Sequence, residues 1–188
     1  LSDEALDNKN CDIAVEYALK ANEEAKGWLG VSAKHNDSLI KENQRSRIRG
    51  IYSAIFEAYR CKADSYLKNG EYEKALNYYI KSDKAISYYT PKSEYWNFEQ
   101  VFSINSQAVC YTKLNNYKRA DSLFVKAIEK YIAIKDTLGK DLALIYSNLA
   151  DSMSDQAEYE DSNLLYEKSI AILQNDTVNN KKDIIKNY

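Results

Sequence analysis

One stretch of the chain decides its fold: GEYEKALNYY, residues 70–79. It opens with Gly70, a residue that suits the left-handed backbone conformation at the end of a helix. Ala75 and Tyr79 follow as a small and a large residue four positions apart, and such residues lie on one face of a helix. The small residue lets a neighbouring helix approach closely, while the large residue fills the space beside it. The stretch therefore predicts a turn followed by the second helix of an antiparallel pair.

The same pattern of large and small residues occurs three times without a gap. In the first helix of each unit, a large residue is followed by a small one four positions later and by a large one three positions after that. The aligned positions are Tyr59, Ala63, Tyr66, Gly70, Tyr72, Ala75, Tyr79 and Ser82; Ile104, Ala108, Tyr111, Asn115, Tyr117, Ala120, Phe124 and Ala127; and Tyr146, Ala150, Met153, Ala157, Tyr159, Ser162, Tyr166 and Ser169. A single helix pair cannot bury its apolar face alone, so we expect the pairs to stack.

These residues resemble the tetratricopeptide repeat (TPR) family. Its signature has an aromatic residue or Leu, then Gly or Ala, then Tyr on the first helix, and Ala, an aromatic residue and Ala on the second. The resemblance covers residues 51–174, with departures at Lys62 and Gln107, where the family prefers Leu, and at Ser162, where it prefers Ala. It implies an all-α fold, a right-handed α-solenoid of stacked antiparallel helix pairs.

The steps of 45 and 42 residues between equivalent tyrosines exceed the common repeat length of 34 residues. They are similar to the long-period subgroup of about 42 residues, which includes bacterial regulatory and sensor proteins.

The resemblance implies a single TPR-like domain over residues 1–188. Within it we expect a partial repeat at 11–26, repeats at 39–88, 93–134 and 140–174, and the start of a further helix or a solubilising cap at 179–188. The partial repeat is interpreted as a second helix, with Ala14 in the place of Ala75 and Ala21 in the place of Ser82. A long helix is expected from about Leu39 to Asn69, in which Gly50 would permit close packing or a kink. The two ends are interpreted either as cut repeats of a truncated chain or as natural caps.

Composition excludes several classes of protein. The 188 residues contain one Pro and five Gly, too few turn-forming residues for a β-sandwich or barrel. A net charge of −2 opposes direct nucleic-acid binding, and no apolar run approaches the length of about 18 residues that a membrane span needs. The single histidine, His35, lies in a polar segment, and the sequence lacks the common nucleophile, phosphate-binding and metalloprotease motifs. We therefore expect no enzymatic activity, no cofactor and no metal.

The cysteines Cys11, Cys61 and Cys110 are odd in number and widely spaced, without a CxxC motif. Free cysteine is among the most often buried residues. We therefore expect small buried side chains on helices, and neither a disulfide framework nor a zinc site. The compartment stays open between cytoplasm and periplasm.

The TPR resemblance also implies a concave face, lined by the first helices, that binds a protein or peptide ligand. Residues expected to face this groove are Arg60, Asp64 and Lys68, then Asn105, Val109 and Thr112, then Ser147, Asn148, Asp151 and Ser154. TPR domains that clamp a chaperone's C-terminal carboxylate need basic residues where this chain has Asp64, Asp151 and Asp155. A neutral or partly basic peptide is therefore the expected ligand.

The function indicated is a non-catalytic scaffold that binds proteins or peptides, as the sensory or interaction region of a larger bacterial regulatory protein. An autonomous adaptor protein and an accessory domain of an enzyme are the alternatives. The identity of the partner, the output domain and the oligomeric state are left open.

Overall fold

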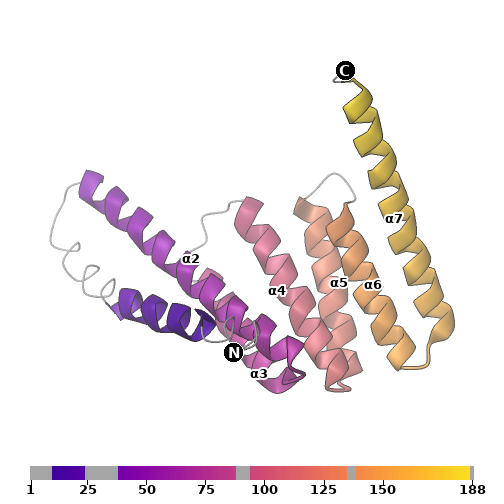
Figure 1. Ribbon diagram of the computed structural model, residues 1–188, viewed down its shortest axis with the longest axis horizontal. Coiled ribbons are helices and arrows are strands. Elements are labelled where there is room, and N and C mark those ends of the chain that lie inside the picture. The colour runs from indigo at the N-terminus through magenta and orange to yellow at the C-terminus, as the bar shows by residue number, and fades with distance from the viewer. Residues whose placement is uncertain (1–9, 24–37, 88–93, 135–138, 187–188) are drawn as a thin grey trace. The chain divides into compact units, whose positions relative to one another are not determined.

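The computed structural model describes residues 10–23, 38–87, 94–134 and 139–186, which are helical apart from short connections (Figure 1). The first helix covers residues 10–23. It is followed by α2 (Ser38–Lys68), α3 (Tyr72–Ser87), α4 (Glu94–Lys113), α5 (Tyr117–Ile134), α6 (Lys140–Asp155) and α7 (Tyr159–Lys186). No strand occurs in the described ranges, so the predicted all-α fold is confirmed. His35 lies outside these ranges.

The chain divides into two compact units, Leu1–Trp96 and Asn97–Tyr188. In the first unit α2 packs along α3, and the helix over residues 10–23 packs on α2 through Ala18, which joins Ile55 and Phe56 in an apolar cluster. In the second unit, α4 to α7 share one core. Its buried residues are Val101, Ile104, Ala108, Ala120, Phe124, Ala127, Tyr131, Leu142, Ala143, Ile145, Leu149 and Ile172.

Small residues occupy the crossing points of the helix pairs, as the sequence predicts. Ala63, Ala108 and Ala150 on the first helices are completely buried. On the second helices, Ala75 and Ala120 are also completely buried. The third pair has Ser162 where the TPR resemblance favours Ala. The Ser162 hydroxyl donates a 2.9 Å hydrogen bond to the backbone carbonyl of Ala150, so its polar atom is satisfied inside the contact.

Serine also occupies the next small position of two second helices, in α3 and α7. The buried hydroxyls of Ser82 and Ser169 donate hydrogen bonds of 3.1 and 2.8 Å to the carbonyls of Phe56 and Ala143. The equivalent residue of the middle repeat is Ala127, which is buried and apolar. A serine is nearly as small as an alanine, and its hydroxyl costs little when a carbonyl accepts its hydrogen bond. Serine and alanine at this position therefore both allow the two helices to pack closely.

Each pair is joined by the same tight turn. Gly70, Asn115 and Ala157 all have left-handed backbone conformations, with φ of 74°, 56° and 62°. The next residue's N–H reaches back to the carbonyl five positions earlier, as Glu71 does to Tyr66 at 2.9 Å. This hydrogen-bond pattern satisfies the last carbonyl groups of a helix and favours Gly or Asn at the left-handed position. Ala157 adopts the conformation despite its Cβ.

The N-terminal helix is shifted in register from the prediction. Ala14, expected to be buried like Ala75, is exposed, whereas Cys11 and Ala18 are 3% and 6% exposed. Cys11, Val15 and Ala18 thus repeat the small–large–small spacing of Ala75, Tyr79 and Ser82. The register differs because Cys11, rather than Ala14, is the small residue at the contact with α2.

Two further expectations concern the long helices. Gly50 lies inside α2 as predicted, but it is exposed, and a Cβ placed there would have no atom within 4 Å. Gly50 therefore does not allow a close helix contact within the described part of the protein. At the other end of the chain, α7 continues to Lys186 and so includes residues 179–186.

We predict that Ala157→Gly raises the free energy of unfolding by about 0.5–1 kcal/mol, measured by urea denaturation. Glycine removes the steric strain of a left-handed L-residue, and its larger unfolded-state entropy offsets only some of that gain. Gly70→Ala is the matched control and should lower stability by about 1 kcal/mol. A Cβ at Gly70 would come no closer than 3.8 Å to the nearest side chain, so only backbone strain is added. Shifts of the same sign in both variants would contradict this explanation.

Candidate functional site

A cavity of about 560 Å³ lies beside α2, and three of the predicted groove residues line it: Arg60, Asp64 and Lys68. The other lining residues are Asn10, Cys11, Glu57, Cys61, Ser65 and Asn69. Residues three, four and seven apart lie on one face of a helix, so α2 itself aligns most of this set. The same periodicity could have identified Glu57 and Cys61 from the sequence. Nothing in the sequence pattern could have identified Asn10 and Cys11, which come from another helix.

The charged side chains of the cavity alternate in sign along α2. Glu57 and Arg60 form an ion pair at 2.8 Å, and the Arg60 guanidinium also lies over the Phe56 ring, 5.4 Å from its centroid. Asp64 follows one turn later, and Lys68 lies exposed in the last turn of the helix. The ring fixes the position of the Arg60 side chain, since a guanidinium is attracted to an aromatic face. The surface is therefore mixed in charge.

Asp64 is oriented by a neighbouring tyrosine. The Tyr79 hydroxyl of α3 donates a 2.5 Å hydrogen bond to its Oδ1 atom. The third repeat has the same arrangement, in which Tyr166 of α7 donates to Oδ1 of Asp151. That hydrogen bond, followed by burial and the negative charge of Asp151, raises the pKa of Tyr166 above its ordinary value. Each bond uses one carboxylate oxygen, and a carboxylate can accept further donors.

The middle repeat replaces this polar pair by an apolar one. At the positions of Asp64 and Tyr79 it has Val109 and Phe124. Phe124 is completely buried, and Val109 is partly buried against the core of the second unit. The tyrosine–aspartate hydrogen bond is thus an optional addition to a helix contact that packing alone can make.

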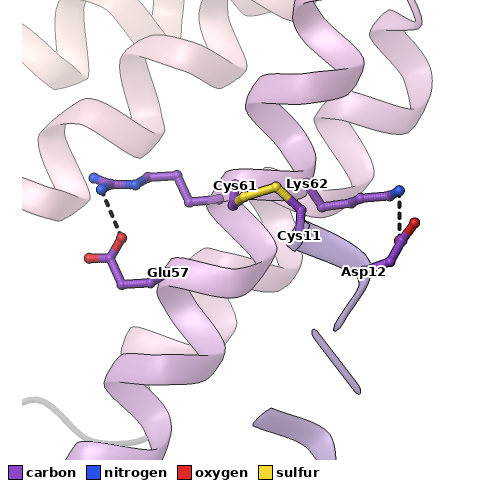
Figure 2. The surroundings of a disulfide bond; sticks show 6 residues. Cys11, Asp12, Glu57, Cys61 and Lys62 are labelled. Carbon is purple, nitrogen blue, oxygen red and sulfur yellow. Dashed lines mark hydrogen bonds and ion pairs between the residues drawn. A yellow bond between two sulfur atoms is a disulfide. The ribbon is translucent and has the colours of Figure 1, made fainter. Parts of the chain in front are cut away.

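Cys11 and Cys61, which both line the cavity, form a disulfide (Figure 2). It joins the helix over residues 10–23 to α2, with a Cα–Cα distance of 5.6 Å and a separation of 50 residues in the sequence. The expectation that the cysteines are unlinked is wrong for these two, because helix packing brings together residues whose spacing shows no pattern. Cys110 is a buried thiol, as expected. Linking residues so far apart restricts the unfolded chain and is worth about 2–4 kcal/mol.

An ion pair lies beside the disulfide. The Nζ of Lys62 lies 2.6 Å from Oδ1 of Asp12, and the Lys62 side chain is only 8% exposed (Figure 2). Burial lowers the pKa of Lys62, but its hydrogen bond to Asp12 and the charge of that carboxylate outweigh burial, so the pKa is raised overall. Lys62, which departs from the TPR signature, therefore holds the N-terminal helix against α2.

Three of the predicted groove residues of the second unit, Asn105, Thr112 and Asn148, form hydrogen bonds within the unit. Asn148 of α6 donates a 3.1 Å hydrogen bond to the side-chain oxygen of Asn105 of α4. Asn105 is 6% exposed, and Thr112 is 3% exposed with its hydroxyl donating to the Ala108 carbonyl. These two residues are less accessible than a groove-facing position requires. Ser147 is half-buried on α6. The role of this set in binding stays a prediction.

The described residues offer no group of His, Cys, Asp and Glu side chains that could hold a metal ion. Among the described helices, none has the length and apolarity needed to cross a bilayer.

Solved structures with the same architecture are similar to this chain. BtubC (BKLC) from P. vanneervenii aligns with a TM-score of 0.57 and 16% identity, over 93% of this chain and 75% of BtubC. The nearly identical TPR-like repeats of a kinesin light chain-type protein from P. anserina align at 0.50, and those of a point variant at 0.51, both at 10% identity. Both alignments cover 92% of this chain. They cover 97% of the P. anserina chain and 96% of its point variant. No protein-family model and no curated protein sequence matches the chain. At these identities the likeness shows the fold alone, which is that of TPR-like helical repeat proteins.

We predict that Tyr79→Phe lowers the free energy of unfolding by about 0.5–1.5 kcal/mol, because Asp64 loses a hydrogen-bond donor. The double variant Tyr79→Phe with Asp64→Val should recover most of that loss, since it installs the pair that the middle repeat already has. Chemical denaturation of the two single variants and the double variant measures the coupling between these residues. Strict additivity would show that the hydrogen bond does not couple them.

Proposed function

We propose that this chain is a non-catalytic scaffold that binds a protein or peptide segment on the face formed by the first helices of its repeats. The TPR-like fold supports this proposal, because stacked helix pairs present extended concave surfaces that bind such segments. The observation that carries it is the convergence of Arg60, Asp64 and Lys68 on one cavity beside α2. These residues come from successive turns of a single helix. Arg60 lies over the Phe56 ring, and Asp64 accepts a hydrogen bond from Tyr79.

The chemistry of the cavity favours a neutral or partly basic ligand. Arg60 already has Glu57 as a partner, which reduces its attraction for a ligand carboxylate. Asp64 is held by Tyr79 through one oxygen and can accept peptide N–H groups or a basic side chain. Asp151 has the same arrangement in the second unit and is exposed. Within either unit, an acceptor oriented by a tyrosine suits a segment that carries donors, because little side-chain entropy is lost in orienting it.

The wider context is also a proposal. Repeats of about 42 residues resemble those of bacterial regulatory proteins, so we infer a sensory or interaction region of a larger regulator that contacts neither nucleic acid nor membrane through this segment. An autonomous adaptor and an accessory domain of an enzyme remain the alternatives, and the reading frame on either side of residues 1 and 188 would separate them. The Cys11–Cys61 disulfide favours the periplasm over the cytoplasm, because disulfides persist in oxidising compartments.

We predict that random peptides selected on the full chain by display are neutral or basic. Their affinity, measured by fluorescence anisotropy, should fall about tenfold in Asp64→Asn, because the amide offers one acceptor fewer and carries no charge. The change is nearly isosteric. Far-ultraviolet circular dichroism and denaturation should show a variant that is still folded.

Glu73→Gln is the matched control for that measurement. It also removes one negative charge, from an exposed side chain on the second helix α3, outside the cavity. Its affinity for the selected peptides should stay within about twofold of the parent, since an exposed charge away from the contact acts mainly through screened long-range forces. Selection of acidic peptides, or equal losses in the two variants, would contradict binding at Asp64.

A further inference from the structure

The helix over residues 10–23 buries little of its surface. Cys11 and Ala18 are its buried residues, and most of the others are exposed. Even the large apolar side chains Ile13 and Tyr17 are 42% and 68% exposed. A helix of this length is marginal in water by itself, because few hydrogen bonds repay the cost of forming its first turn. The helix therefore depends on its attachment to α2.

The disulfide supplies a large part of that attachment. One of the two buried residues, Cys11, is itself bonded to Cys61. The other is Ala18, whose single methyl group gains little from burial. The ion pair between Lys62 and Asp12 lies beside the disulfide (Figure 2), but the Asp12 side chain is 63% exposed, so water competes for its carboxylate. The docked position of the N-terminal helix thus depends on the bond between the two sulfur atoms.

The helix pair of α2 and α3 has contacts of its own. Ala63 and Ala75 are completely buried where the two helices cross. The Ser82 hydroxyl of α3 donates a hydrogen bond to the Phe56 carbonyl of α2. None of these contacts involves the helix over residues 10–23. Loss of the disulfide is therefore expected to free one helix and to leave the pair of α2 and α3 folded.

The two sulfur atoms differ in accessibility, which fixes the course of a reduction. Cys61 is exposed, whereas Cys11 is 3% exposed. A thiolate of a dithiol reductant attacks Sγ of Cys61, and Cys11 leaves as a thiolate that takes a proton from water. The second thiolate of the dithiol then attacks its own sulfur in the mixed disulfide, and Cys61 leaves and is protonated. The dithiol has become a disulfide, and two electrons have passed to the protein.

We propose that the Cys11–Cys61 disulfide is a redox latch: reduction by a dithiol frees the helix over residues 10–23 from α2, and oxidation docks it again. Asn10 and Cys11 line the same cavity as Asp64, so a freed helix takes away one side of that cavity. A ligand bound at Asp64 then loses contacts. This consequence for the ligand rests on the proposed function, whereas the release of the helix does not.

Amide hydrogen exchange, measured by mass spectrometry on the full chain, tests the latch without any ligand. The chain is compared in its oxidised state and in excess dithiothreitol. Protection of residues 10–23 should fall at least about tenfold on reduction, while that of α3 and of α4 to α7 should stay within about twofold. Equal protection of residues 10–23 in both states would overturn the proposal. An equal loss over α2 and α3 would show a crosslink that stabilises the whole unit, and would overturn it too.

Three variants separate the disulfide from its surroundings. Cys61→Ser removes the bond permanently and should match the reduced parent, with or without dithiothreitol. Cys110→Ser is the matched control, because it removes the buried free thiol and should keep the response to reduction. Asp12→Asn weakens the ion pair and, when oxidised, should keep the protection of residues 10–23 within about threefold of the parent. A loss in oxidised Asp12→Asn as large as that on reduction would assign the attachment to the ion pair and overturn the latch.

The effect on the ligand is measured with the peptides selected on the oxidised chain. Their affinity should fall at least about fivefold on reduction and in Cys61→Ser, since both remove Asn10 and Cys11 from the cavity. Unchanged affinity on a chain whose helix is freed would overturn regulation of the site. The absence of any peptide that binds the oxidised chain would instead contradict the proposed function, and hydrogen exchange would still decide the latch.

Discussion

The close approach of two helices at a small residue is the contact on which each repeat of this protein depends. Ala63, Ala108 and Ala150 have no exposed surface, and each is followed twelve residues later by a second small residue on the partner helix. A larger side chain at either position would push the helices apart by more than the flanking aromatic residues could fill. The left-handed turn between the two helices also keeps them close, because it lets the chain reverse direction within a few residues.

Some positions of these apolar helix contacts carry polar side chains. They occur where the side chain can form a hydrogen bond without moving the two helices apart. Ser162 bonds to the Ala150 carbonyl, and Tyr79 bonds to Asp64 from a completely buried ring position. The middle repeat does without either, with Ala120 and Phe124 at these places. What distinguishes the repeats is therefore the polar surface that each first helix presents. That surface is where the proposed ligand contacts lie, and beside α2 it lines a cavity.

The features of the structure that could be predicted are those fixed by local spacing. Helical periodicity and turn chemistry suffice to locate Ala108 in a helix contact and to predict a left-handed Asn115. Alignment of α2 alone brings Arg60, Asp64 and Lys68 to one cavity. The features that could not be predicted depend on which helices meet. The Cys11–Cys61 disulfide spans 50 residues, and the Asn105–Asn148 bond joins α4 to α6 across 43. The predicted register of the N-terminal helix is wrong for the same reason, since Cys11 counts as a small core residue only once its contact with α2 is known.

The free energy of unfolding of Ala108→Leu, measured by urea denaturation against that of Val125→Leu, tests the small-residue contact most directly. Ala108 has no exposed surface, whereas Val125 is 48% exposed on the neighbouring helix α5. Overpacking at Ala108 should cost about 1–3 kcal/mol, and the exposed substitution should stay within about 0.5 kcal/mol of the parent. Equal stability of the two variants would show that the helix pairs do not require a small residue at their crossing.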